Sequence, residues 1–166
     1  MLIRALSTSE TELCRALGAL TVAAYTTLPG HVPEPGYEAE LADVARRASM
    51  GDTEVLAALD GFRPLGGVTF VASTASPLAE HDDPEAASFR MLAVDPAASG
   101  RGVGEALVRA CIERAKDIGR TNLAIHSTAW MADAHRLYGR LGFVRAEDLD
   151  WTPVPGIDLI GFRLEL

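Results

Sequence analysis

Lysine and cysteine are scarce in this sequence of 166 residues, and long apolar runs are absent. Lys116 is the single lysine among 15 basic residues, and Cys14 and Cys111 are the two cysteines. Both cysteines fall in apolar stretches with helical periodicity, so we expect buried thiols in a reducing compartment rather than a disulfide. No apolar run approaches the roughly 18 residues that span a membrane, and the N-terminus lacks the pattern of a signal peptide. We therefore expect a cytoplasmic protein.

Basic residues are too few and too scattered for a nucleic-acid interface. Acidic residues outnumber basic ones by 23 to 15, which gives a net charge of −8. No basic stripe is present that could replace the counterions along a phosphate backbone. We expect no nucleic-acid partner, no membrane partner and no bound metal. A negative field favours a cationic or neutral small-molecule partner.

Length and composition are those of one folded unit. Hydrophobic residues make up 48% of the chain and charged residues 23%, and no repeat or Gly/Ser linker divides it. We expect a single domain over residues 1–166, and the sequence is compatible with a homodimer.

Apolar periodicity and turn residues predict alternating strands and helices. Ser7 and Glu10 have the spacing of a capping box, and the proline-rich stretch 25–37 predicts a loop between two helices. The expected strands are 2–5, 54–60, 65–73, 87–94, 122–127, 143–146 and 158–164, and the expected helices are 8–24, 37–48, 105–118 and 132–141. This order predicts an α+β fold, or α/β by a looser convention.

The most informative segment is Phe89–Val108, FRMLAVDPAASGRGVGEALV. A strand leads into a turn that contains Gly100, Gly102 and Gly104, and an amphipathic helix follows at once. Glycines let backbone N–H groups approach a ligand closely, and the first helical turn adds unpaired donors at the positive end of the helix dipole. This arrangement predicts a phosphate-binding turn, although neither the P-loop nor the dinucleotide fingerprint is present.

A second segment, Met131–Phe143, contains Ala134, Tyr138 and the pair Gly142-Phe143. Taken in order with the first segment, it resembles the GCN5-related N-acetyltransferases (GNAT superfamily), whose two motifs have this spacing. The resemblance covers residues 87–146. It implies a mixed, mostly antiparallel sheet flanked by about four helices, with the strands 87–94 and 122–127 splayed apart to admit acetyl-CoA.

The resemblance also assigns the acetyl-CoA site. The pantetheine arm is expected along the strand 87–94, the pyrophosphate on the turn Ser99–Gly104, and the thioester beside the second motif. The cofactor-binding residues that follow are Leu92, Ala93, Val94, Ser99, Gly100, Arg101, Gly102, Val103, Gly104, Met131, Ala134 and Tyr138. The implied activity is transfer of the acetyl group to a primary amine of a small molecule or peptide, by direct attack in a ternary complex.

Tyr138 suits the role of general acid, because a phenol can donate a hydrogen bond or a proton to a departing thiolate. Two positions depart from the family pattern. Ser99 stands where Arg or Gln is usual, and Ser88 stands where many members have a Glu as general base. Without that Glu, a non-catalytic acyl-CoA-binding sensor is the alternative to an enzyme.

Two residues are candidates to replace the missing base. Glu85 lies three residues before Ser88 and could act through water, and His126 ends the strand that opens beside the cofactor. Histidine changes its charge near neutral pH, which suits proton transfer. For the acceptor pocket we expect Tyr25, His31 and Tyr37, from the loop between the first two helices.

Overall fold

An eight-stranded sheet runs through the computed structural model, which describes all 166 residues. Its strands lie in the order β1-β2-β3-β4-β5-β8-β6, and β7 pairs with β8. Only β4 and β5 run parallel, which confirms the mixed, mostly antiparallel sheet. The strands are β1 (Leu2–Ala5), β2 (Thr53–Asp60), β3 (Arg63–Val71), β4 (Ala86–Val94), β5 (Asn122–Thr128), β6 (Val144–Arg145), β7 (Trp151–Val154) and β8 (Ile157–Glu165).

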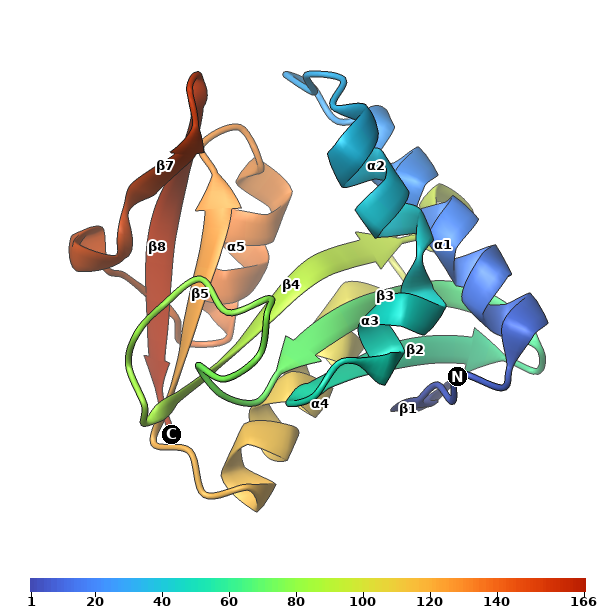
Figure 1. The fold of residues 1–166 in the computed structure, drawn as a ribbon, viewed down its shortest axis with the longest axis horizontal. Helices are drawn as coiled ribbons and strands as arrows, with labels where there is room; N and C mark the ends of the chain where they lie inside the picture. The colour runs from blue at the N-terminus through green and yellow to red at the C-terminus, as the bar shows by residue number, and fades with distance from the viewer.

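Helices cover both faces of the sheet (Figure 1). In Figure 1, α1 and α3 lie in front of β2 and β3, and α4 lies behind them. None of the helices is both long enough and apolar enough to cross a membrane. The helices are α1 (Thr11–Thr26), α2 (Pro35–Ala42), α3 (Val44–Ser49), α4 (Val103–Asp117) and α5 (Ala132–Arg140), with short 3₁₀ turns at Pro96–Ala98 and Glu147–Leu149.

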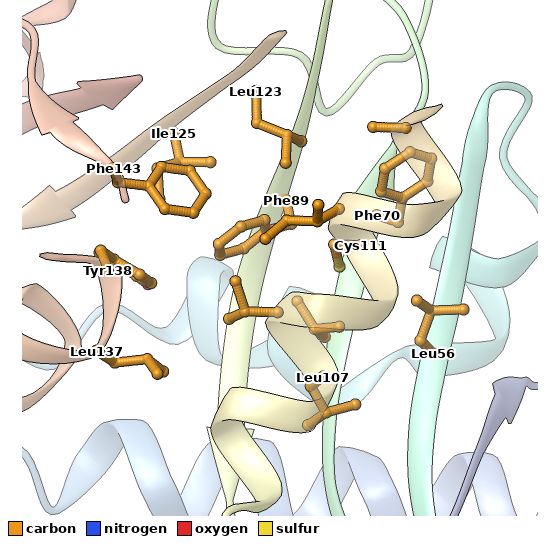
Figure 2. Packing of buried hydrophobic residues seen from close by; sticks show 14 of the residues in the cluster. Leu56, Phe70, Phe89, Leu107, Cys111, Leu123, Ile125, Leu137, Tyr138 and Phe143 are labelled. Atoms are coloured by element: carbon orange, nitrogen blue, oxygen red, sulfur yellow. The ribbon is translucent and has the colours of Figure 1, made fainter. Parts of the chain in front are cut away.

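Strand β2 shows how the sequence supports two helical layers. Val55, Ala57 and Leu59 belong to the apolar cluster under α1, whereas Leu56 and Ala58 belong to the larger cluster under α4. Successive side chains of a strand point to opposite faces, so a strand buried on both faces is apolar at nearly every position. The larger cluster continues toward α5, as Figure 2 shows around Phe89 and Tyr138. Cys14 and Cys111 are buried free thiols, as expected.

The two halves of the sheet meet along a very short seam. β4 pairs with β5 only through Ala86 with Asn122 and Ala87 with Leu123. Beyond these pairs the two strands diverge, as the V between β4 and β5 in Figure 1 shows. The divergence confirms the expected splay and leaves the β5-facing edge of β4 without a strand partner from Ser88 onward.

A β-bulge lies in the middle of β4. The register against β3 shifts by one residue between Gly67 and Thr69, and Met91 has a φ of 55°. Positive φ is uncommon outside glycine, and bulges redirect the side chains of the strand that carries them. The bulge lets the consecutive residues Arg90 and Met91 both line one cavity, which a regular strand would not allow.

Several element boundaries differ from those expected. Helix α1 begins at Thr11 rather than Thr8, because Ser7 and Glu10 form a turn in which the Glu10 carboxylate accepts from the Ser7 N–H at 2.8 Å. The loop before α2 is shorter than expected, so Tyr25 lies in α1 and Tyr37 in α2. The strand β7 was not expected from the sequence. It is four residues long and contains Pro153, which is tolerated only where the ladder needs no N–H donor.

The helix expected over residues 37–48 is divided in two at Asp43. That residue has a non-helical backbone, with φ −88° and ψ 69°, and its carboxylate accepts from the Arg46 N–H at 3.0 Å. The buried side chain of Arg47 stabilises the break. Its Nη1 donates to the carbonyls of Glu40 and Leu41 at the end of α2, and its Nε donates to Thr69 Oγ1 on β3 at 3.1 Å.

We expect Arg47→Ala to lower the free energy of unfolding by about 2–4 kcal/mol, because it leaves a cavity and two helix-end carbonyls without a donor. Arg46→Ala is the matched control, since Arg46 is an exposed arginine of the same helix. The control should change stability by less than about 0.5 kcal/mol. Urea unfolding of both variants measures the difference, and equal effects would show that the Arg47 contacts contribute nothing.

Candidate functional site

The glycine turn before α4 presents a group of free backbone donors. Gly100 and Gly102 have φ values of 74° and 75°, and a Cβ at either position would meet nothing within 4 Å. The N–H groups of residues 100 and 102–105 donate to no acceptor in the protein. They lie at the N-terminus of a helix of 15 residues, where the helix dipole favours an anion. The turn therefore has the donors and the open space that a phosphate ligand needs.

Two side chains of the turn are exposed, and a third packs in the apolar core. Ser99 and Arg101 are exposed, and Arg101 Nη2 lies 4.0 Å from Asp60 Oδ2 on β2. Val103 is 2% exposed and packs in the main apolar cluster, which fixes the start of α4. The free hydrogen-bond donors of this turn are thus backbone groups.

Gly104 brings the turn close to both β4 and α5. A Cβ on Gly104 would lie 3.6 Å from Val94 at the end of β4 and 3.6 Å from Leu137 on α5. Leu92, Ala93 and Val94 lie on the open edge of β4, which leads directly into the turn. The residues expected to hold the pantetheine and the pyrophosphate are therefore adjacent, and the turn lies against α5, which carries Tyr138.

Tyr138 lies in an aromatic cluster beside this surface. Its ring contacts Phe89, Phe143 and Phe162 at centroid distances of 5.8, 5.7 and 5.9 Å, and Figure 2 shows Tyr138, Phe89 and Phe143 together. The side chain is 5% exposed. Burial raises the pKa of Tyr138 above its ordinary value, so the phenol keeps its proton at physiological pH.

A cavity of about 240 Å³ lies where β4 and β5 diverge. One side is formed by the segment from α1 to α2, and the other by the hairpin of β7 and β8, including Val154 and Leu159. Trp130, after β5, reaches the segment between α1 and α2. A Cβ added to Gly30 in that segment would lie 3.2 Å from the Trp130 ring. Most of the lining is apolar, which is typical of a small-molecule site.

The three residues expected in the acceptor pocket all line this cavity. Tyr25 and Tyr37 meet edge to face with ring centroids 6.2 Å apart, and burial raises the pKa of both phenols. His31 Nε2 lies 3.3 Å from Glu38 Oε1. Met131 lines the cavity as well, at the start of α5.

The candidate bases are separated by the fold. His126 lines the cavity, whereas Glu85 is exposed and does not. Ser88 is buried in β4, opposite Val71, and also lies outside the cavity. Ala134, expected beside the cofactor, is half-buried on α5. No group of three or more His, Cys, Asp or Glu residues is placed to hold a metal ion.

Sequence reasoning missed three charged residues of the cavity, Glu34, Glu80 and Arg90. The side chains of Glu80 and Arg90 are 14% and 19% exposed, and Arg90 Nη2 lies 2.9 Å from Glu80 Oε1. A signal was present, because an arginine within a buried strand needs hydrogen-bond acceptors and the segment Glu80–Glu85 supplies four acids. Distance along the chain made Glu85 the nearer candidate, but the loop folds so that Glu80 reaches the strand.

Comparison with protein families and solved structures agrees with this geometry. Residues 19–143 match the model of the Acetyltransferase (GNAT) family. The chain therefore belongs to the GNAT family and is an acetyltransferase by class. A search of curated protein sequences finds no match.

Solved structures with the same fold cover the whole chain. The aminoglycoside 6'-acetyltransferase type Ii has a TM-score of 0.73 and 13% identity, with 99% of this chain and 97% of that chain covered. YncA from Salmonella typhimurium, solved with acetyl-CoA, has a TM-score of 0.69 and 20% identity over 100% and 94%. The ribosomal-protein-alanine N-acetyltransferase from Brucella melitensis has a TM-score of 0.64 and 16% identity over 100% of both chains.

We expect Gly102→Asp to weaken acetyl-CoA binding at least about tenfold, because it places a carboxylate beside the expected pyrophosphate. Gly102→Asn is the matched control, since Asn and Asp have the same size and both tolerate the positive φ of this position. Calorimetry with acetyl-CoA measures both affinities. If the Asp and Asn variants bind equally well, the phosphate does not lie at this turn.

Proposed function

We propose that this protein transfers the acetyl group of acetyl-CoA to a primary amine of a small molecule or peptide, by direct attack within a ternary complex. The observation that carries the proposal is the open edge of β4. It joins the free N–H groups before α4 at one end to the cavity at the other, with Tyr138 beside it. Acetyl-CoA supplies the activated acetyl group as a substrate.

The cofactor residues follow from this surface. The N–H groups of residues 100 and 102–105 would bind the pyrophosphate, and the edge at Leu92–Val94 would pair with the amides of the pantetheine arm. Both interactions use the backbone, so Ser99 in place of the family's usual Arg or Gln does not remove the main donors. Met131 and Ala134 lie toward the thioester end in this arrangement.

Tyr138 would stabilise the departing sulfur. Burial raises the pKa of its hydroxyl, which therefore stays protonated. A phenol with a raised pKa is a reluctant proton donor but a persistent hydrogen-bond donor. We therefore assign it a hydrogen bond to the developing thiolate, which strengthens as negative charge builds on sulfur.

The cavity favours a small amine over a folded protein substrate. About 240 Å³ of space behind the mouth suits one small molecule or the end of a peptide chain. The structural neighbours act, by their names, on acceptors as different as an aminoglycoside and a ribosomal protein, so the acceptor must be found by experiment. A cytoplasmic location, a single domain and the absence of a nucleic-acid partner stay predictions.

A panel of primary amines with thiol detection tests the proposal. We expect steady CoA release with at least one small amine, above the rate of acetyl-CoA hydrolysis without acceptor. Mass spectrometry should show the acetylated amine in equal amount. Binding of acetyl-CoA with no turnover of any amine or peptide N-terminus would instead support the acyl-CoA sensor.

Tyr138→Phe should lower kcat about 10²-fold or more and change acetyl-CoA affinity much less, because the lost hydrogen bond acts in the transition state. The ring stays, so the free energy of unfolding should fall by less than about 1.5 kcal/mol. Measuring kcat, acetyl-CoA affinity and Tm on the same preparation separates these effects. An unchanged kcat would mean that Tyr138 only packs against its aromatic neighbours.

A further inference from the structure

His126, in the cavity wall, has a buried ring nitrogen that can accept a hydrogen bond but has no partner. Its Nε2 lies 2.8 Å from the Leu149 carbonyl oxygen. A carbonyl only accepts hydrogen bonds, so Nε2 must carry a hydrogen, and the lone pair of the neutral ring lies on Nδ1. The side chain is 2% exposed, and Nδ1 has no hydrogen-bond partner. An acceptor buried in this way is costly unless a donor reaches it.

The group that faces Nδ1 is another acceptor. Glu80 Oε2 lies 3.6 Å from His126 Nδ1, and the other oxygen of Glu80 is held by Arg90. Both residues line the cavity. Two lone pairs therefore face each other at the wall of the site, at a separation that suits a third group with N–H donors for both of them.

No neighbouring side chain provides that donor. Arg90 is the one permanent cation of the cavity, and its contacts are the first oxygen of Glu80 and the Leu78 carbonyl. Asp150, near His126, accepts from Arg145 and the Gly161 N–H. The other titratable groups around the pair are Tyr25, His31, Glu34 and Tyr37 in the cavity wall, and His81, whose ring nitrogens have no partner.

We propose that Glu80 and His126 form the site that binds the acceptor's ammonium group and removes its proton, in place of the carboxylate missing at Ser88. This inference rests on the acetyltransferase function proposed above. The ammonium donates one N–H to Glu80 Oε2 and another to His126 Nδ1. Glu80 also stabilises the positive charge that His126 acquires when it takes the proton. The carboxylate therefore binds the ammonium, and the imidazole accepts the proton.

The proton and electron balance is complete. An N–H bond of the ammonium breaks, a bond from hydrogen to Nδ1 forms, and the amine nitrogen keeps the electron pair. The neutral amine attacks the acetyl carbon, the C–S bond breaks, and a second proton of the attacking nitrogen goes to the thiolate. The imidazolium returns its proton to water. The net products are the amide, CoA as the free thiol, and one proton.

The rest of the cavity defines the substrate class. Around the pair the walls are apolar or aromatic, including Leu28, Val32, Trp130 and Val154. The charged side chains of the lining are Glu34, Glu80 and Arg90, so the cavity has a small excess of negative charge rather than a strongly anionic wall. The geometry therefore favours a small primary alkylamine with an apolar or aromatic body.

Two amine substrates of equal length distinguish a role of His126 in proton removal from a role in packing. 2-Phenylethylamine is protonated at neutral pH, whereas O-benzylhydroxylamine has the same ring and chain length and is unprotonated. His126→Gln keeps a donor for the Leu149 carbonyl but removes the base. It should lower kcat/KM about 10²-fold or more for 2-phenylethylamine, and less than about threefold for O-benzylhydroxylamine, which needs no base before attack.

Glu80→Gln should act mainly on KM for 2-phenylethylamine, because it removes the negative charge that binds the ammonium. Asp82→Asn is the matched control, since Asp82 is an exposed acid of the same segment and does not line the cavity. Equal losses with both acceptors in His126→Gln would mean a structural role and would overturn the proposal, as would unchanged kinetics in both variants.

Nitrogen-15 NMR of the wild-type protein gives a readout that needs no turnover. In the neutral ring of His126 the hydrogen should lie on Nε2, and Nδ1 should be the bare nitrogen. A neutral ring with its hydrogen on Nδ1 would overturn the proposal even if acetyl transfer occurs. Failure of the wild-type enzyme with every amine would overturn the proposed function instead, and the NMR result would still stand.

Discussion

The rest of the structure depends on how soon β4 and β5 part. They share two residue pairs and then diverge, so the parallel seam of the sheet is closed at one end and open at the other. Unpaired strand edges normally invite another chain to pair with them. Here the edge of β4 leads into the free N–H groups before α4, and the space beyond it becomes the cavity. A longer seam would pair the free edge of β4 and close the cavity.

The open seam also explains why charge is buried in this part of the molecule. The bulge at Met91 turns two consecutive side chains toward the cavity, and one of them is Arg90. A guanidinium with little exposure needs acceptors for its N–H groups, and Glu80 provides a carboxylate from the loop before β4. That pairing in turn brings the second oxygen of Glu80 toward His126. Strand geometry, rather than adjacency in sequence, thus selects which acid reaches the site.

Much of the fold could be predicted because its signals are local. Apolar periodicity gave α1, α4 and α5 to within a few residues, and the alternating strands β2, β3 and β4 were expected near their observed positions. The errors lie where tertiary contacts outweigh local preference. Arg47, whose side chain stabilises the break between α2 and α3, is held by Thr69 on β3, 22 residues away, and β7 pairs with β8. Neither effect is visible in a window of the sequence.

The sequence alone determined the family, the turn of free donors before α4 and the position of Tyr138 on α5, because each depends on residues close together in the chain. The tertiary structure decided which acid serves the cavity. Glu80 and Glu85 are two glutamates of one acidic segment, yet Glu80 is paired with Arg90 and Glu85 is exposed. Which ring nitrogen of His126 has no hydrogen-bond partner was likewise decided by the Leu149 carbonyl, 23 residues away, because this carbonyl pairs with Nε2. Hydrogen-bond pairing in a buried site depends on distance in space, which the order of residues does not specify.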